Sequence, residues 1–149
     1  MPEPTPSIST NLLFLADFEP EDVTRRTSLT PTRTYRRGDP TWRCGDAQSP
    51  MRFDHDGWRY TVVDANGWSF DEHIRAVGEL LDKHSSRLAE ARVASGANLV
   101  IRLSGITSGS TPEIRFPPQL VSALAAAGAS IEVDISHAPN DEADDSPKT

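Results

Sequence analysis

The sequence holds a single cysteine, Cys44, in 149 residues. An intrachain disulfide is therefore excluded, and such sparse use of cysteine is typical of cytosolic proteins. No stretch approaches the 18 consecutive apolar residues of a membrane-spanning helix, and the N-terminus lacks the basic and then apolar pattern of a signal peptide. We therefore expect a cytoplasmic protein that does not bind membranes.

Basic residues are also in deficit. The chain has 15 Lys and Arg against 22 Asp and Glu, a formal net charge of -7. Proteins that bind nucleic acid or anionic membranes normally carry an excess of positive charge, so we expect neither partner. The last eleven residues hold four acidic residues against Lys148, which is -3 of the total. The rest of the chain is only mildly acidic.

No catalytic or metal-binding motif is recognisable. The four histidines form no pair with the spacing of metal ligands, and the run Asp54-His55-Asp56 is ordinary turn chemistry before a strand. Cys44 has no base beside it in the sequence, and the Gly-Ser-rich stretch 105–110 lacks the Lys-Ser/Thr ending of a phosphate loop. We expect no catalytic residues, no metal and no cofactor, which leaves enzymatic activity open but favours a non-enzymatic protein.

The composition divides the chain into three parts. Residues 1–10 hold three prolines and little to bury, and residues 139–149 are acidic and almost without apolar side chains. Such segments cannot offset the entropy lost on ordering, so both ends are expected to be disordered. Residues 11–138 are expected to form a single domain, which is long enough to bury a core.

Hydrophobic periodicity predicts an alternation of strands and helices. Strands are predicted over 11–16, 32–37 (an edge strand), 58–64, 98–105, 113–116 (a hairpin partner of the preceding strand) and 130–136. A short helix of roughly two turns is predicted from Pro20, with its exit at 29–31. A long one follows the Ser69–Glu72 capping box to about Gly96, with a break near Ser85 and Ser86. A third is predicted over 117–127, and a small irregular strand or hairpin over 38–57.

This order predicts an α+β domain of two layers. A mainly antiparallel or mixed sheet of five to six strands would carry two main helices and a short one on one face. No repeat is visible at the level of residues.

The stretch TSLTPTRTYRRGDP (27–40) concentrates positive charge in an acidic chain. Arginine beside tryptophan suits the recognition of a carboxylate, a phosphate or a partner protein. The candidate binding residues are Arg33, Arg36, Arg37, Asp39, Trp42 and Trp58. The alternative, which we favour, is an edge strand guarded by charge, with the arginines paired to nearby acids such as Asp39 and Trp58 in the core.

The segment FEPEDVTRRTSLTPTRTYRRGDP resembles the opening motif of a bacterial family, the domain-of-unknown-function family 4279. The matching positions are Pro20, Glu21, Val23, Thr24, Leu29, Pro31, Thr32, Arg37, Gly38 and Asp39. The resemblance continues through a Gly-Trp strand and a Ser-capped helix and spans about residues 11 to 136. It implies a small stand-alone cytosolic protein and no established activity. Some members resemble immunity-type partners in bacterial toxin neighbourhoods.

Two functions are consistent with these observations. The first is a non-enzymatic domain that binds another protein, as an immunity-type or regulatory partner. The second is a domain that binds a small anionic ligand, or an enzyme, with Arg33, Arg36 and Arg37 holding the anionic group. A homodimer through the 32–37 edge strand is a further alternative.

Overall fold

The fold is a five-stranded mixed sheet with three helices packed on it. The structure, a computed structural model, describes residues 7–41, 51–63, 67–107 and 113–137. In chain order the elements are β1 (Ser7–Ala16), α1 (Pro20–Thr27), β2 (Arg33–Tyr35), β3 (Asp56–Val63), α2 (Phe70–Ser95), β4 (Asn98–Thr107), α3 (Pro118–Ala127) and β5 (Ser130–His137). The strand order is β2-β3-β1-β4-β5, antiparallel except for the parallel pair β4 and β5. The predicted α+β class is confirmed.

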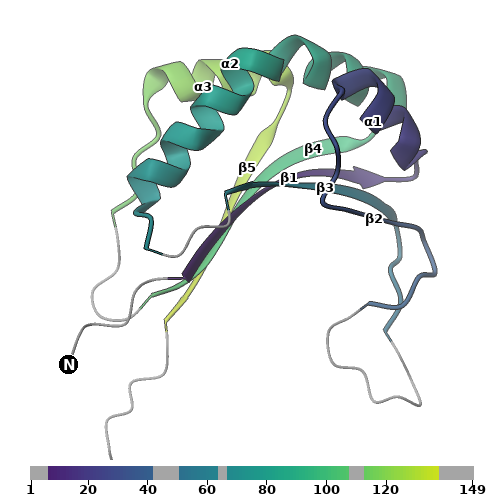
Figure 1. Ribbon diagram of the computed structural model, residues 1–149, viewed down its shortest axis with the longest axis horizontal. Coiled ribbons are helices and arrows are strands. Elements are labelled where there is room, and N and C mark those ends of the chain that lie inside the picture. Colours follow the sequence, from purple (N-terminus) through teal and green to yellow (C-terminus); the bar gives the residue numbers. More distant parts are fainter. Residues whose placement is uncertain (1–6, 42–50, 64–66, 108–112, 138–149) are drawn as a thin grey trace, which may run out of the picture.

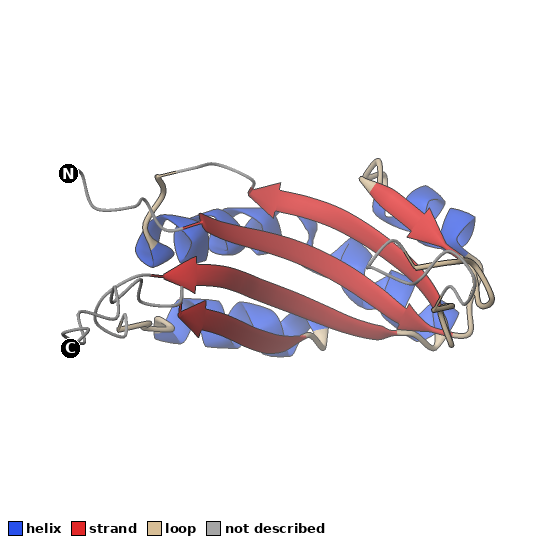
Figure 2. Ribbon diagram, turned by 90° about the horizontal axis from the view of Figure 1, so that it is seen from below, coloured by secondary structure: helices blue, strands red, loops and turns tan. Residues whose placement is uncertain are grey.

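All three helices lie on the same side of the sheet. Figure 1 shows the sheet as an arch with α1, α2 and α3 on its outer side, and Figure 2 shows the strands from the opposite, inner side. No helix among the described residues covers this inner side, which we call the open face. Since side chains alternate along a strand, each strand supplies one set to the helices and another to the open face.

The core lies between the sheet and the helices. Phe14 of β1 and Trp58 of β3 are directly opposite each other in the register, and their rings meet edge to face with centroids 5.5 Å apart. Both side chains are fully buried, and the Trp58 indole donates a hydrogen bond to Thr24 Oγ1 of α1, at 3.0 Å. The ring contact therefore adds to the pairing of β1 with β3, and the hydrogen bond links β3 to α1.

The long helix is continuous. Ser69 and Glu72 form the predicted capping box, and α2 then runs unbroken to Ser95. The expected break at Ser85 and Ser86 is wrong. Leu81 and Leu88, seven residues apart on either side of the serines, are both fully buried. An uninterrupted helix keeps that spacing on one face, and this burial outweighs the modest helix propensity of serine.

Two further predictions need correction. Residues 113–116 form no strand, because β4 pairs instead with β1 and, in parallel, with β5. The connection through α3 permits this parallel pairing. At the other end, residues 7–10 were expected to be disordered but belong to β1, where Ile8 and Thr10 are buried and pair with β4. Residues 1–6 and the acidic tail from 139 lie outside the described residues.

The remaining elements agree with expectation. Helix α1 has Pro20 in its first turn, and β2 is a three-residue strand at the edge of the sheet. An antiparallel bridge between Pro40 and Arg52 provides the small hairpin expected in the 38–57 region. Among the described helices, none is both long and apolar enough to cross a membrane.

One buried histidine makes the stability of the fold sensitive to pH. His73 of α2 is fully buried, and a 2.7 Å hydrogen bond joins its Nδ1 to Thr10 Oγ1. Its Nε2 is shielded from solvent without a hydrogen-bond partner. Burial lowers the pKa of His73, because the charged imidazolium would lose its hydration, and this outweighs the opposing effect of the nearby Glu72. His73 is therefore neutral in the folded protein at neutral pH.

We predict that the free energy of unfolding falls as the pH drops below about 6.5, the pKa of a histidine in the unfolded chain. Below that pH the unfolded state binds a proton that the folded state excludes. The free energy of unfolding then falls by up to about 1.4 kcal/mol per pH unit. Urea unfolding at pH 7.5, 6.5 and 5.5 measures the slope, which should be smaller in His73→Gln and unchanged in His137→Gln, an exposed control. Equal slopes in wild type and His73→Gln would contradict this assignment.

Candidate functional site

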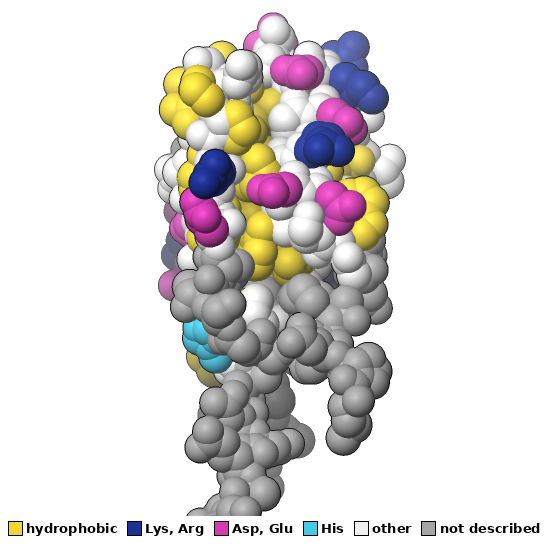
Figure 3. Space-filling model, turned by 90° about the vertical axis from the view of Figure 1, so that its left-hand side faces the viewer, with side chains coloured by type: hydrophobic (Ala, Val, Ile, Leu, Met, Phe, Trp, Pro, Cys, Tyr) yellow, Lys and Arg dark blue, Asp and Glu magenta, His cyan; other side chains and the backbone are white. Residues whose placement is uncertain are grey.

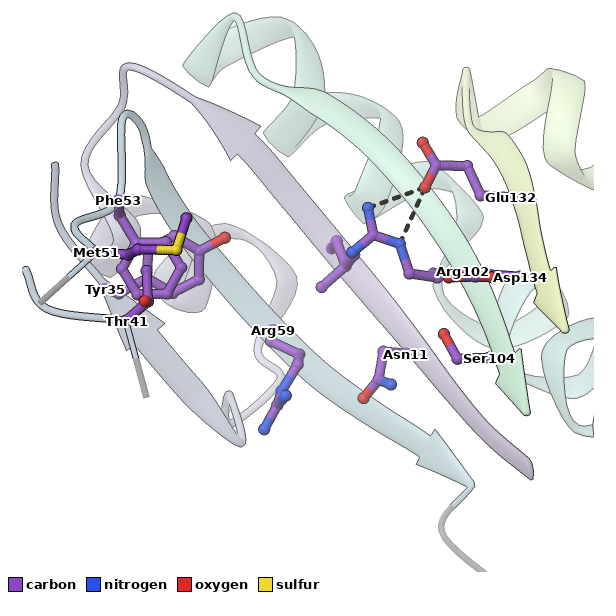
Figure 4. A pocket seen from close by; sticks show the side chains of 11 residues that line it. Asn11, Tyr35, Thr41, Met51, Phe53, Arg59, Arg102, Ser104, Glu132 and Asp134 are labelled. Carbon is purple, nitrogen blue, oxygen red and sulfur yellow. Dashed lines mark hydrogen bonds and ion pairs between the residues drawn. The ribbon is translucent and has the colours of Figure 1, made fainter. Parts of the chain in front are cut away.

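The open face contains a hollow to which all five strands and the hairpin contribute side chains. Its volume is about 600 Å³, within the range of ligand-binding clefts. It is lined by Asn11, Leu13, Tyr35, Thr41, Met51, Phe53, Arg59, Arg102, Ser104, Glu132 and Asp134. Figure 4 shows an aromatic group at one end, the Arg102–Glu132 pair at the other, and Arg59 and Asn11 between them.

The aromatic end is built by Tyr35 and Phe53. Their rings are stacked with centroids 3.7 Å apart. The Tyr35 ring crosses directly over Gly57, its partner in the β2–β3 register, and a Cβ atom at Gly57 would overlap the ring carbon Cζ. Glycine is therefore required at this position to let the ring lie flat on the strand. The ring is thus fixed between β3 and the hairpin and forms a preformed wall of the hollow.

A chain of hydrogen bonds holds this wall. His55 Nε2 lies 3.0 Å from the Tyr35 hydroxyl, and His55 Nδ1 lies 2.5 Å from Asp54 Oδ1. Burial raises the pKa of Tyr35, and the hydrogen bond from His55 lowers the pKa of Asp54. Asp56 instead accepts hydrogen bonds from the backbone N–H groups of Phe18 and Arg37. Within the Asp54-His55-Asp56 run, Asp54 and His55 therefore pair with each other, whereas Asp56 binds the backbone elsewhere.

Backbone hydrogen bonds join the two arms of the hairpin that carries Phe53. The N–H groups of Gly38, Thr41 and Phe53 donate to the carbonyls of Phe53, Met51 and Asp39, at 2.8, 2.7 and 2.9 Å. Met51 presents its side chain at the rim of the hollow with 66% of its surface exposed. Exposed methionine beside aromatic rings is typical of surfaces that bind other proteins.

The opposite end of the hollow is polar. Arg102 of β4 and Glu132 of β5 are partners in the strand register and form a salt bridge of 2.9 Å. Asn11 donates to Ser9 Oγ and accepts from Thr61 Oγ1, both at 3.0 Å, so its amide is held in place. Asp134 adds a negative charge beside Ser104, its partner in the register.

Arg36 and Arg37 are held in ion pairs away from this hollow. Arg36 pairs with Glu19 and Glu21 at the start of α1, and Arg37 pairs with Asp17 at 2.6 Å. The Arg36 guanidinium lowers the pKa of Glu19, chiefly by hydrogen bonding. Asp39 accepts from the backbone N–H of Arg36, at 2.8 Å, and so closes the turn. These contacts agree with the interpretation of the arginines as partners of nearby acids.

The other candidate binding residues do not lie together in one site. Arg33 lies directly opposite Arg59 in the β2–β3 register. Trp58 is fully buried against the helices, on the far side of the sheet from the hollow, so it cannot contact a ligand there. Its place among the proposed binding residues is corrected to one in the core. Trp42, like Cys44, lies outside the described residues.

A second hollow lies between α2 and α3. It has a volume of about 530 Å³ and is lined by Asp71, Ile74, Arg75, Gly78, Glu79, Asp82, Arg115, Pro117, Gln119 and Leu120. Figure 3 shows apolar surface on this end of the molecule, surrounded by charged side chains of both signs. With no predominant sign of charge and no stacked aromatic wall, this hollow is less clearly a binding site than the open face. Among the described residues, no group of three or more His, Cys, Asp or Glu could hold a metal ion.

Sequence reasoning missed the central residues of the hollow. The alternation that places Trp58, Tyr60 and Val62 on one face of their strand also places Arg59 on the other. Arg102 interrupts the apolar run of β4 in the same way. A charged residue between apolar neighbours in a predicted strand could thus have identified the side chains that lie on the open face.

Comparison with protein families agrees with the opening motif. The model of DUF4279, described as a domain of unknown function, matches residues 10–138. The chain belongs to the DUF4279 family. No curated protein and no solved structure was found to match this DUF4279 chain. Within residues 18–40, the opening motif and here called the family segment, Glu19 and Glu21 pair with Arg36, and Arg37 pairs with Asp17 just before it.

For this DUF4279 domain we predict that Gly57→Ala lowers the free energy of unfolding by about 1–3 kcal/mol, because the methyl group displaces the Tyr35 ring. Gly78→Ala is the matched control, since a Cβ atom there meets nothing within 4 Å. That change lies inside α2 and should stabilise by about 0.5–1 kcal/mol.

A double-mutant cycle measures the contact between Tyr35 and position 57. Chemical denaturation gives the free energy of unfolding of the wild type, Gly57→Ala, Tyr35→Ala and the double variant. In the Tyr35→Ala background, Gly57→Ala should lose most of its cost. An equal cost in both backgrounds would show that the ring does not lie over Gly57.

Proposed function

We propose that this DUF4279 domain is a non-enzymatic, cytoplasmic protein-binding domain, and that its partner contacts the open face of the sheet. A regulatory or immunity-type partner protein fits the family resemblance. The observation that supports the proposal most is the composition of the hollow. Arginine, tyrosine, phenylalanine and an exposed methionine gather there on a concave surface that no described helix covers.

The rigidity of the aromatic wall supports the same proposal. Tyr35 is fixed by its stack on Phe53, by its position over Gly57 and by its hydrogen bond to His55. A side chain already held in one conformation loses little entropy on binding, which favours affinity. Ring positions of this kind are typical of the residues that contribute most to protein interfaces.

A second candidate is a small anionic ligand or substrate. The unpaired Nε of Arg59 in a hollow of about 600 Å³ favours such a ligand. Arg36 and Arg37 pair with acids outside the hollow, so they would not contact a ligand bound in it. Direct binding of inorganic phosphate or free glutamate to the purified protein distinguishes this candidate from the first. The homodimer through β2 stays a prediction, which a monomer mass in light scattering would contradict.

A photo-crosslinking residue placed at Ser104, in the hollow, tests the proposed function. The matched control is the same residue at Ser122, exposed on α3 on the helix side. In cells of the source organism we predict a covalent adduct with a second protein from position 104 and none from position 122. Adducts from position 122 alone, equal adducts from both positions, or none from position 104 would contradict the open face as the binding surface.

A further inference from the structure

Arg59 lies at the centre of the open face. In the register of the sheet it lies opposite Arg33 of β2 on one side and Leu13 of β1 on the other. Like charges directly opposite each other in a sheet are unfavourable. Loss of solvation and the charge of Arg59 both lower the pKa of Arg33. The two arginines therefore place two positive charges side by side in the sheet of an acidic protein.

Five of the other described arginines have an acidic partner, but the Arg59 side chain has none among the described residues. Its Nε is shielded from solvent and has no hydrogen-bond partner, and it forms no ion pair with any described carboxylate. Carboxylate partners are found for Arg25, Arg36, Arg37, Arg102 and Arg115. Arg92 Nε is also without a partner, but that side chain packs over Gly128 between the helices. The charge of Arg59 is thus without an acidic partner among the described residues, and an anionic group of a partner would supply one.

The surroundings of Arg59 favour a carboxylate carried on a polypeptide. Glu132, at the other end of the hollow, is paired with Arg102 and not with Arg59. Leu13, Met51 and the Tyr35–Phe53 stack supply apolar surface in the same hollow. A free inorganic anion would leave this apolar surface exposed to water, whereas an acidic side chain flanked by apolar ones would cover it.

We propose that Arg59 anchors an acidic side chain of the partner polypeptide, held against the aromatic wall of Tyr35 and Phe53. This inference rests on the proposed function and adds the chemistry of the partner to it. The planar guanidinium suits a bidentate pair with the carboxylate through its two terminal nitrogens. Asp134, at the other end of the hollow, excludes a second acidic group there and favours a basic one.

Nuclear magnetic resonance of the ¹⁵N-labelled full chain tests the anchor through the Arg59 Nε–Hε signal, assigned by its absence in Arg59→Lys. The probes are poly-L-glutamate, poly-L-lysine and inorganic phosphate at equal charge concentration. We expect poly-L-glutamate to shift the signal and poly-L-lysine to leave it in place. No shift with poly-L-glutamate, or an equal shift with phosphate, would overturn the proposal of an acidic polypeptide.

The yield of the crosslinked adduct from position 104 tests the role of Arg59 separately from the proposed function. Arg59→Gln should reduce its yield by about tenfold or more, because the bidentate, charge-assisted pair with the partner's carboxylate is lost. Arg25→Gln, an equal loss of charge on the helix side, should leave it unchanged, and thermal unfolding checks that both variants are folded. An undiminished adduct in Arg59→Gln would overturn the anchor and leave the open face as the binding surface. Absence of an adduct in the unsubstituted background would overturn both.

Discussion

The contact of Phe14 with Trp58 across β1 and β3 determines which side chains face the helices. Both rings are fully buried, and they meet at a centroid distance of 5.5 Å. Because side chains alternate along a strand, a slip of one residue would exchange the two faces. The same pairing that buries these rings therefore directs Leu13 and Arg59 to the open face. The existence of the hollow depends on the register of the core.

Ion pairs within the folded structure explain why the family segment carries so many charged residues. The acids around the start of α1 and the arginines after β2 lie 15 to 20 residues apart in the chain and pair with one another. Each exposed pair contributes little to stability by itself. Together with the turn at Asp39, they orient the hairpin that carries Met51 and Phe53. The segment thus supports one wall of the hollow from outside.

The sequence predicted the architecture better than the site. Local signals with a physical cause, such as the Ser69–Glu72 capping box and the Pro20 helix start, gave the correct elements. The parallel pairing of β4 with β5 depends on contacts between distant segments, which no local pattern shows. Arg59 was overlooked for a related reason. Its importance comes from Arg33, Leu13 and the hairpin around it, and these meet only in the folded sheet.

Covalent footprinting tests the central claim, that the open face is where this DUF4279 domain binds its partner. Hydroxyl-radical labelling of the purified protein and of the protein in source-cell extract compares two sets of exposed side chains. Met51 reports on the open face, and Val93 and Val121 report on the helices. The account predicts that extract protects Met51 and leaves both valines as reactive as before. Protection of the valines with Met51 unchanged would contradict it.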